Sequence, residues 1–583
     1  MLPMRSPLRR AAGYVLWRWR RRPPTVTTAD HGAPSDRIKA LLTPPRGSSW
    51  HVVLLADRRA RWRVQRWMRT FFTDDILIFA AGFRPSRTRQ PRVTVKKLTV
   101  PTDALHALRR IPPVDLIVDL RRPVPTDDVQ RATWRMLHPA VAEHGAYIHL
   151  DASPTTPDVL RGWARTRSST MTERARYRPT TDVRRLGDYA IHLMAGPVYL
   201  KVPDRRAASL QTRAPELRVD LIDRLPAADI APTGKIHRNR ESSDTAHLDA
   251  ALHAPAATMR HYQGQLRVLS HMALTHQRTL LPPSFRYPNE QVPTNVLATD
   301  IDADYTTLPA STDRAIPRLD GDFFDLTASY HAHFGHFITE IPAKLWGWGV
   351  AKAHIPDLRA LLRVPRDYQP TYERELLSAY GLSSDDVVWQ SEPVEVSSWV
   401  ACTSLWQNHD PYWFHPAVAD VWAQLRRHLI VPHSSQGRQR LFVSRPSGMA
   451  HRDCRNAPQV EELFREYGFQ VVYPEEHSLA ESAALFGGAT TVAGFGGSAL
   501  FNVLFSEHLR TMIILNHEAY LARNEHLYAS ALGADSHYFW SAPDVRQASA
   551  VLDPKAFQST WDFDFARNER LLRATLEALP ESQ

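Results

Sequence analysis

The 583-residue chain contains only two cysteines, Cys402 and Cys454. Two cysteines cannot form a disulfide framework, and their scarcity is typical of proteins in a reducing cytoplasm. The chain also lacks any apolar run of the roughly 20 residues that a membrane-spanning helix needs. Its apolar patch from Ala11 to Trp17 is short and is followed by arginines, so no secretory signal is expected. The sequence therefore predicts a cytoplasmic protein.

Acidic residues are absent from the first 29 positions, and this shapes the formal net charge of +11. Seven arginines precede Asp30, and the rest of the chain has a net charge of only +4. A net charge of +4 spread over the remaining residues is typical of an ordinary solvated surface, so nucleic acid is not expected as a partner. Residues 1–24 also contain Trp17 and Trp19. This segment either attaches to an anionic membrane face, at the inner side of the membrane, or is a disordered basic leader.

The length and an apolar fraction of 43% indicate several folded domains. Residues 1–48 read as a basic leader and linker. In residues 49–155, strand-like runs such as 51–56 and 114–119 alternate with helix-like segments, one of them expected at 127–144. This alternation predicts a small Rossmann-like accessory domain with a parallel sheet. No glycine follows its first strand, so no dinucleotide site is predicted there.

The remainder of the chain divides into a connecting region and two further α/β units. Residues 156–320 contain many prolines and short β-type runs, which predicts a mixed, β-rich connecting region. Its polar stretch at 230–249 is expected to be an exposed loop. Strand and helix patterns return from Phe323 and predict two Rossmann-like lobes, residues 321–432 and residues 433–583, facing a cleft. The fold class is therefore α/β.

A glycine-rich run, Gly494 to Asn502, follows the apolar strand-like segment 489–493 and precedes a segment that can be helical. Glycines let a backbone approach a phosphate closely, and the free amides at a helix start favour an anion. Many such turns bind nothing, so the motif alone is weak evidence. It nevertheless makes Gly494, Gly496, Gly497, Ser498 and Asn502 candidate anion-binding residues.

The segment 330–348 has an apolar stripe at helical spacing and a second face on which His336, Glu340 and Lys344 follow at i, i+4 and i+8. A histidine and a carboxylate on one helix can orient each other for proton transfer near neutral pH. An exposed polar face with a helix-stabilising pair is the alternative. Pro342 is expected to kink this helix. The neighbouring His331 and His333 also invite a zinc interpretation, although the spacing matches zinc sites only loosely.

Ser444 and Arg445 stand at the carboxyl end of the predicted strand 440–443, where open α/β sheets bind ligands. The arginine fork can hold a diphosphate by two parallel hydrogen bonds. A structural salt bridge is the alternative for Arg445.

Taken in order, the motifs at residues 334–346, 442–446 and 461–502 resemble glycosyltransferase family 61, known in bacteria from capsular polysaccharide biosynthesis proteins. The resemblance implies a two-lobed GT-B fold and an inverting transfer from a nucleotide sugar to a glycan or lipid-linked glycan acceptor, without a catalytic metal or other cofactor. It matches His336 and Glu340 to the family's catalytic helix. It matches Ser444, Arg445 and the glycine run to the donor site.

The chain departs from the resembled pattern within the glycine run. The family's loop typically reads GxHGAGLTN, and its histidine corresponds to Gly496 here, while its threonine corresponds to Phe501. Two alternatives to an active transferase therefore stay open. One is a catalytically degenerate protein that binds a nucleotide or glycan, and the other is a zinc-dependent hydrolase built on the histidines.

Overall fold

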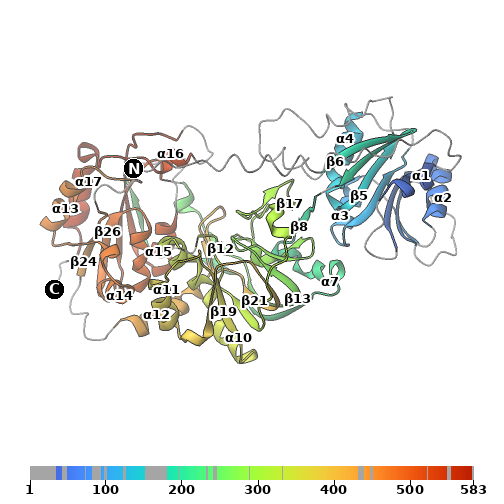
Figure 1. The fold of residues 1–583 in the computed structure, drawn as a ribbon. Coiled ribbons are helices and arrows are strands. Elements are labelled where there is room, and N and C mark those ends of the chain that lie inside the picture. The colour runs from blue at the N-terminus through green and yellow to red at the C-terminus, as the bar shows by residue number, and fades with distance from the viewer. Residues whose placement is uncertain are drawn as a thin grey trace, which may run out of the picture.

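A computed structural model describes most of the chain between residues 34 and 580 (Figure 1). The described residues are 34–42, 49–71, 74–81, 93–97, 101–121, 127–150, 180–194, 196–231, 234–239, 246–287, 289–330, 332–430, 439–446, 451–520, 523–547 and 553–580. The basic segment of residues 1–24 and His331 of the zinc interpretation lie outside the described residues. The strands form a 7-stranded, an 11-stranded and a 6-stranded sheet and two small two-stranded pairs. The protein is therefore a mixed α/β fold with several sheets of parallel strands.

The N-terminal sheet has the strand order β3-β2-β1-β4-β5-β7-β6. Its first five strands are parallel, as the alternating pattern predicted. They are β1 (His51–Asp57), β2 (Asp75–Ala81), β3 (Val93–Lys97), β4 (Val114–Asp119) and β5 (Val141–Leu150). The helices are α1 (Pro34–Leu41), α2 (Arg61–Thr70), α3 (Pro101–Leu108) and α4 (Asp127–Leu137). Helix α1 lies within the predicted linker and packs Ile38 into the core of this sheet.

Two features of this sheet differ from the expected elements. The helix predicted for 127–144 ends at Leu137, and a 3₁₀ turn that contains Pro139 leads into β5. Proline has no amide hydrogen to continue the helix. The sheet also continues beyond residue 155, because the hairpin of β6 (Thr180–Leu186) and β7 (Tyr189–Met194) pairs with β5 in antiparallel fashion.

The 11-stranded sheet joins the connecting region to the segment predicted as the first lobe. Strand β13 (Ala257–Val268) pairs with β21 (Val394–Cys402), which continues through β18 (Asp322–Asp325) and β19 (Arg359–Arg363) to β20 (Val387–Gln390). The other strands are β8 (Tyr199–Lys201), β9 (Arg218–Leu225), β14 (Leu274–His276), β15 (Thr279–Leu280), β16 (Thr299–Asp300) and β17 (Tyr305–Thr307). The predicted boundary at residue 320 thus falls inside one sheet.

Helices cover the parallel part of this sheet. They are α8 (Phe334–Glu340), α9 (Pro342–Leu345), α10 (Trp348–His354), α11 (Tyr372–Tyr380) and α12 (Val418–Leu429). A further short helix, α7 (Leu210–Arg213), lies near β9. The predicted kink is confirmed, because α8 ends before Pro342 and α9 begins at it. The small pairs are β10 (Ala228–Ile230) with β12 (Leu252–Ala254), and β22 (Trp406–Gln407) with β23 (Trp413–Phe414).

The C-terminal sheet has the order β11-β28-β27-β26-β24-β25, and all its pairings are parallel. Five strands come from the last third of the chain: β24 (Gln439–Val443), β25 (Gln470–Val472), β26 (Ala489–Phe495), β27 (Thr511–His517) and β28 (Asp535–Ser541). The helices are α13 (Ala457–Glu466), α14 (Leu479–Gly487), α15 (Asn524–Leu532), α16 (Pro554–Phe557) and α17 (Phe565–Glu577). Strand β11 (Ile236–Arg238) is the edge strand.

The edge strand β11 corrects the expectation of an exposed loop at 230–249. It comes from the connecting region and pairs with β28, where the rings of His237 and His537 stack 4.3 Å apart. The amide of Lys235 also donates to Asp535 Oδ1 at 2.6 Å. Polar composition suggested a loop, but an edge strand needs only one buried face and tolerates polar residues.

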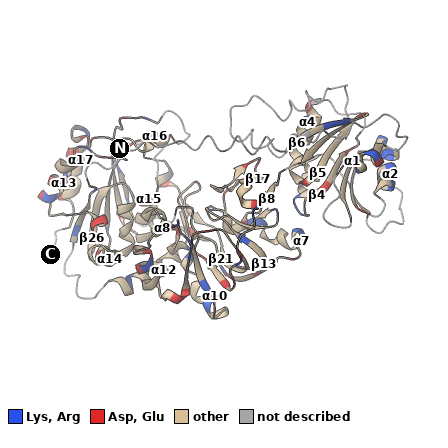
Figure 2. Ribbon diagram, viewed as in Figure 1, with Lys and Arg blue, Asp and Glu red and all other residues tan. Residues whose placement is uncertain are grey.

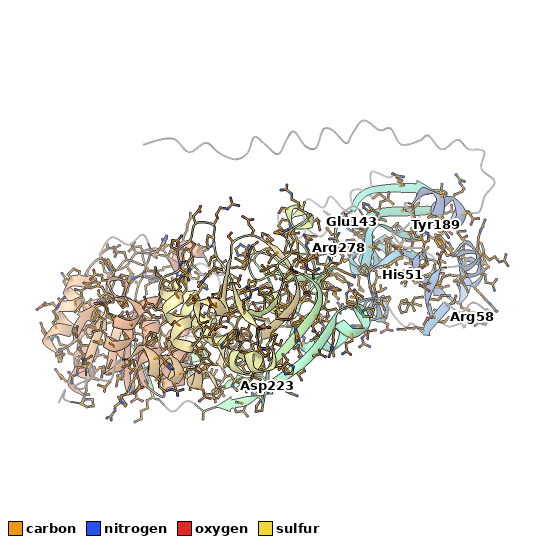
Figure 3. The ribbon with its side chains drawn as sticks, turned by 60° about the horizontal axis from the view of Figure 1, so that its bottom comes forward. His51, Arg58, Glu143, Tyr189, Asp223 and Arg278 are labelled. Carbon is orange, nitrogen blue, oxygen red and sulfur yellow. The ribbon has the colours of Figure 1, made fainter. Side chains whose placement is uncertain are left out.

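The three sheets lie in a row, with the N-terminal sheet at one end and the C-terminal sheet at the other (Figure 1). One apolar cluster runs from the N-terminal sheet into the middle of the molecule, and it includes Val53, Trp134, Leu200 and Tyr262. The neighbouring Glu143 and Arg278 form an ion pair of 2.6 Å across the same junction (Figure 3). None of the helices in the described part of the chain has the length and hydropathy needed to cross a membrane.

Three fully buried histidines, His138, His149 and His192, stand in the N-terminal domain around Trp134. The Nε2 atoms of His149 and His192 lie 3.1 Å apart, a distance at which one neutral ring donates to the other. Burial lowers the pKa of His192 well below 6.5, and the neighbouring His149 and His138 lower it further. The native state therefore holds His192 in its neutral form.

We expect this domain to lose stability as the pH falls below 6.5. Below pH 6.5, His192 binds a proton in the unfolded chain but not in the native protein. The free energy of unfolding therefore falls by about 1.4 kcal/mol per pH unit for one histidine. Urea unfolding at pH 7.5 and pH 5.0 measures the loss, and His192→Phe, which keeps a ring but cannot titrate, is expected to reduce it. The exposed His253→Gln is the control. An unchanged pH dependence in His192→Phe would contradict the assignment.

Candidate functional site

The predicted pair of His336 and Glu340 is formed on α8. The imidazole Nδ1 lies 2.8 Å from Glu340 Oε1. The side chain of Glu340 is 11% exposed and that of His336 is 28% exposed, so the carboxylate lies beneath the imidazole. Within the described residues, His336 Nε2 makes no hydrogen bond. The histidine therefore presents one free ring nitrogen outward while the glutamate fixes the other.

Arg286, which sequence reasoning missed, completes this pair. Its Nη2 lies 2.8 Å from the same Oε1 atom of Glu340, and its guanidinium lies over the ring of Tyr287 at 4.9 Å. Burial alone would raise the pKa of Glu340, but Arg286, the hydrogen bond from His336 and the more distant charge of Lys344 outweigh it and lower this pKa. Glu340 is therefore an ionised carboxylate at neutral pH. No motif marked Arg286, which lies 54 positions before Glu340 in the β-rich region.

The sequence predicted that Lys344 shares a helix face with Glu340, but its ammonium group contacts β18 and the residues after it. Its Nζ donates to Asp325 Oδ2 at 3.1 Å and to the carbonyl oxygen of Thr327 at 2.7 Å. The break at Pro342 starts a new helix, and the i+8 position no longer follows the axis of α8. Lys344 is thus a buried structural cation that anchors α9 to β18.

The glycines of the loop after β26 serve different purposes. A Cβ atom on Gly494 would lie 2.4 Å from the carbonyl oxygen of Val443, so this glycine permits close pairing with β24. A Cβ atom on Gly496 would lie 2.3 Å from Asn516 Nδ2. Gly497 has φ 150°, a backbone region that favours glycine. The Asn516 amide thus occupies the space into which a side chain at position 496 would project.

Two of the loop amides are already used within the protein. The Gly496 amide donates to the carbonyl oxygen of Leu515 at 2.9 Å, and the Gly497 amide donates to Glu525 Oε1 at 2.8 Å. Burial raises the pKa of Glu525, and its hydrogen bonds and the charge of Arg452 offset part of this rise. The 3₁₀ helix Ser498–Phe505 begins immediately after Gly497. The first amides of a helix have no acceptor within it, so those of Ser498 and Ala499 are the ones placed for an anion.

The loop contacts the helix of the histidine–glutamate pair. A Cβ atom on Gly335 would lie 2.6 Å from Ser498 Cβ, so only glycine allows this approach. One turn later, Thr339 Oγ1 and Tyr528 Oη lie 3.2 Å apart, and the Tyr528 ring stacks on Phe501 at 5.2 Å. The two elements that were predicted separately from sequence are therefore neighbours.

The side chain of Ser444 is buried in the protein interior, whereas that of Arg445 faces a cavity. Ser444 is fully buried, and its hydroxyl donates to Glu461 Oε1 at 2.5 Å. Arg445 instead lines a cavity, and its buried Nη1 makes no hydrogen bond with any residue that the structure describes. Burial lowers the pKa of Arg445, and the nearby Arg452 lowers it further. Arg445 is thus a guanidinium with unused hydrogen-bonding capacity.

The cavity beside Arg445 has a volume of about 700 Å³, a size typical of small-molecule sites. It lies between α8 and α11 on one side and the C-terminal sheet with α14 on the other. Within it, Asn502 Nδ2 donates to the carbonyl oxygen of Ala499, while Oδ1 is buried with no partner among the described residues. The lining residues include Phe334, Tyr372, Glu375, Arg445, Glu475, His477, Gly497, Ser498 and Asn502.

Arg452 is a second cation at this site that the sequence did not reveal. Its guanidinium lies over the rings of Tyr520 at 4.8 Å and Phe557 at 5.5 Å, and it would lie 3.6 Å from a Cβ atom on Gly497. Partial burial lowers the pKa of His333, and the charges of His336 and Arg452 lower it further. No carboxylate of the described residues forms an ion pair with Arg445 or Arg452.

Of the three histidines in the zinc interpretation, the structure shows two, His333 and His336, close together. The rings of His333 and His336 lie 5.1 Å apart, edge to face. His331 falls outside the described residues. Over the described ranges, no three histidine, cysteine or acidic side chains are grouped so that they could hold a metal ion.

Comparison with known proteins gives one family match. Residues 334–513 match the model of the family described as Glycosyltransferase 61. This range includes α8, Arg445, Arg452 and the whole glycine loop, but not Arg286. No curated protein matches the chain.

Several solved structures match the chain at low identity. They include the MycE methyltransferase of the mycinamycin biosynthetic pathway with Mg and SAH, at 15% identity over 25% of this chain and 42% of that chain with a TM-score of 0.20. The methyltransferase SibL matches at 16% identity over 27% and 53%, with a TM-score of 0.18. Human N-acetylserotonin methyltransferase matches at 12% identity over 24% and 47%, with a TM-score of 0.16. This chain spans about half of each, and likeness at this level supports no argument.

The close contact at Gly335 leads to a first test of the site. Gly335→Ala is expected to push α8 from Ser498 and to destabilise the protein by about 1–3 kcal/mol, as overpacking does. Gly349→Ala is the matched control, because no atom lies within 4 Å of its added Cβ. Thermal unfolding measures both variants. Equal stability of the two variants would show that α8 and the loop are not held in this contact.

Proposed function

We propose that the chain moves a sugar from a nucleotide-sugar donor to a glycan acceptor with inversion at the transferred carbon, because residues 334–513 match the model of glycosyltransferase family 61. The family supports glycosyltransferase activity in general. The observation that supports the finer proposal is the contact between α8, which carries the histidine–glutamate pair, and the glycine loop, which lines the cavity with Arg445 and has Arg452 beside Gly497. The two sheets around this cavity are proposed to be the lobes of a GT-B arrangement.

The proposed base is His336. Its Nε2 takes the proton of the acceptor hydroxyl while the hydroxyl oxygen forms a bond to the sugar carbon. The bond from that carbon to the diphosphate breaks at the same time, and its electron pair leaves with the diphosphate oxygen. Glu340 holds Nδ1 and stabilises the imidazolium that forms, as a buried carboxylate does beside a histidine base. Arg286 keeps Glu340 ionised and fixed for this task.

The proposed diphosphate site consists of Arg445, Arg452 and the amides of Ser498 and Ala499. Preorganised positive groups stabilise charge that develops on a leaving group without further rearrangement. Two neighbouring guanidinium groups repel each other, as the lowering of the pKa of Arg445 by Arg452 indicates, and an anion between them reduces that repulsion. Of the other predicted donor residues, Gly494, Gly496 and Ser444 support the loop and strand from behind, whereas Gly497 and Asn502 line the cavity.

A catalytically degenerate protein remains the second candidate, because Asn516 fills the space beside Gly496 where the resembled loop carries histidine. A panel of nucleotide sugars in thermal-shift measurements, followed by a donor-hydrolysis assay, separates the two. Binding without turnover would favour the degenerate protein. The proposed setting is capsular or other cell-surface polysaccharide synthesis, with residues 1–24 at the inner face of the membrane.

Removal of the proposed base or its partner is expected to abolish transfer. His336→Asn and Glu340→Gln should each lower turnover by about 10²–10⁴-fold, the usual contribution of a general base. Arg286→Gln should lower it as well, and Arg286→Lys should recover part of the loss because a cation again faces Glu340. Single-turnover transfer measures these effects, with the exposed Glu462→Gln as the control. Near-normal turnover of His336→Asn or Glu340→Gln would remove that residue from the mechanism.

The two arginines are expected to act on the phosphates alone. Arg445→Ala should abolish transfer, and both Arg445→Ala and Arg452→Ala should weaken binding of a free nucleoside diphosphate by at least about tenfold, a modest loss for a charge-assisted pair. Binding of the unphosphorylated nucleoside should not change. Calorimetric titration compares the two ligands, with Arg546→Ala, an exposed arginine, as the control. If the nucleoside and the diphosphate lost affinity equally, the phosphate assignment would be wrong.

A further inference from the structure

A second cationic surface lies far from the proposed donor site, on α2 and the turn before it. Five arginines of this segment are exposed: Arg58, Arg59, Arg61, Arg66 and Arg69. Residues 58–71 contain no acidic residue. Figure 2 shows the basic residues of α2 at the outer end of the N-terminal sheet, at the opposite end of the molecule from the C-terminal sheet. We refer to these five side chains with Trp62 as the arginine face.

The arginine face is fixed outward by the packing of the opposite side of α2. Val64, Trp67 and Met68 are buried against the N-terminal sheet, and the Trp67 ring stacks on Phe71 at 5.8 Å. An amphipathic helix with one buried stripe cannot rotate without exposing it. The charged side chains therefore project from a folded helix and the turn before it, and not from a mobile tail.

Neighbouring carboxylates do not neutralise these arginines. Asp57 caps the turn by accepting the amides of Arg59 and Ala60. Asp74 pairs with Lys39, and Asp36 accepts a hydrogen bond from Thr70. Among the described residues, no ion pair involves any arginine of the face. An uncompensated row of like charges is unfavourable in the free protein and favours an anionic partner.

Trp62 stands within the arginines and is 54% exposed. It lies four positions before Arg66 within α2, so these two side chains share one side of the helix. The guanidinium of Arg63 lies over its ring at 4.1 Å. A tryptophan exposed among cations combines an apolar ring with an N–H donor, which suits the boundary between lipid headgroups and acyl chains.

We propose that the arginine face docks onto the surface of an anionic phospholipid bilayer. A bilayer offers a plane of phosphates to all five arginines at once and an apolar layer beneath for Trp62. A nucleic acid would satisfy the charges, whereas a bilayer also takes up the exposed ring of Trp62. Helix α1 lies beside the face, because Ser35 Oγ and Thr70 Oγ1 lie 2.7 Å apart. This proposal does not depend on the sugar transfer.

The test uses the full-length protein and vesicles of pure phosphatidylcholine or of a mixture rich in phosphatidylglycerol. Flotation should show that the protein binds the anionic vesicles alone, and this binding should weaken at high salt. The triple variant Arg58→Gln, Arg66→Gln, Arg69→Gln should bind at least about tenfold more weakly, given the contribution of each arginine near such a surface. Trp62→Ser should weaken binding severalfold at unchanged charge.

The matched control removes three exposed arginines elsewhere, in Arg427→Gln, Arg546→Gln, Arg570→Gln. It should bind as the wild type does, and both triple variants should unfold at the wild-type temperature because the side chains are exposed. Wild-type binding by the α2 variant, with residues 1–24 intact, would overturn the proposal. An equal loss in both triple variants would also overturn it, since net charge alone would then explain binding. Tighter binding to a short DNA duplex than to vesicles, with the same dependence on α2, would assign the face to nucleic acid instead.

Discussion

The ion pair that holds Glu340 is the constraint on which the site depends. A buried carboxylate is stable as an ion only when it is paired and hydrogen-bonded. Glu340 receives both of its partners at one oxygen atom, His336 from its own helix and Arg286 from the β-rich region. The β-rich region can deliver Arg286 because β13 and β21 make it part of the same sheet as the strands beneath α8. The site is thus completed by a segment outside residues 334–513.

The apposition of the two sheets depends on a second constraint, which is space. Gly335 lets α8 approach Ser498, and Tyr528 fills the core behind this contact between Phe501 and Trp422. One apolar cluster includes residues of both sheets, such as Phe337, Leu425, Leu500 and Met512. The proposed base and the proposed diphosphate site therefore keep their relative position without a bound ligand. Such preorganisation is what an electrostatic site requires.

Much of the local structure followed from the sequence. The strands β1, β4, β24 and β26 lie close to their predicted ranges, because apolar runs bounded by turn residues have few alternatives. The kink at Pro342 and the end of the first helix of the His336 segment followed from the missing amide of proline. The pairing of strands from distant regions did not follow. Nothing in residues 230–249 indicated that β11 pairs with β28, because its partner lies about 300 positions away and edge strands tolerate polar residues.

The sequence by itself determined two local elements. One is the His336–Glu340 pair, whose i, i+4 spacing favours contact on a helix, and the other is the glycine loop, whose backbone at Gly497 favours glycine. Only the tertiary structure decided the partners of these elements. It placed Arg286 on Glu340, Arg452 beside Gly497, Asn516 against Gly496 and Ser444 on Glu461. The physical reason is that spacing along a chain fixes contacts within one helix or turn. Contacts between charges far apart in sequence depend on how the sheets close on one another.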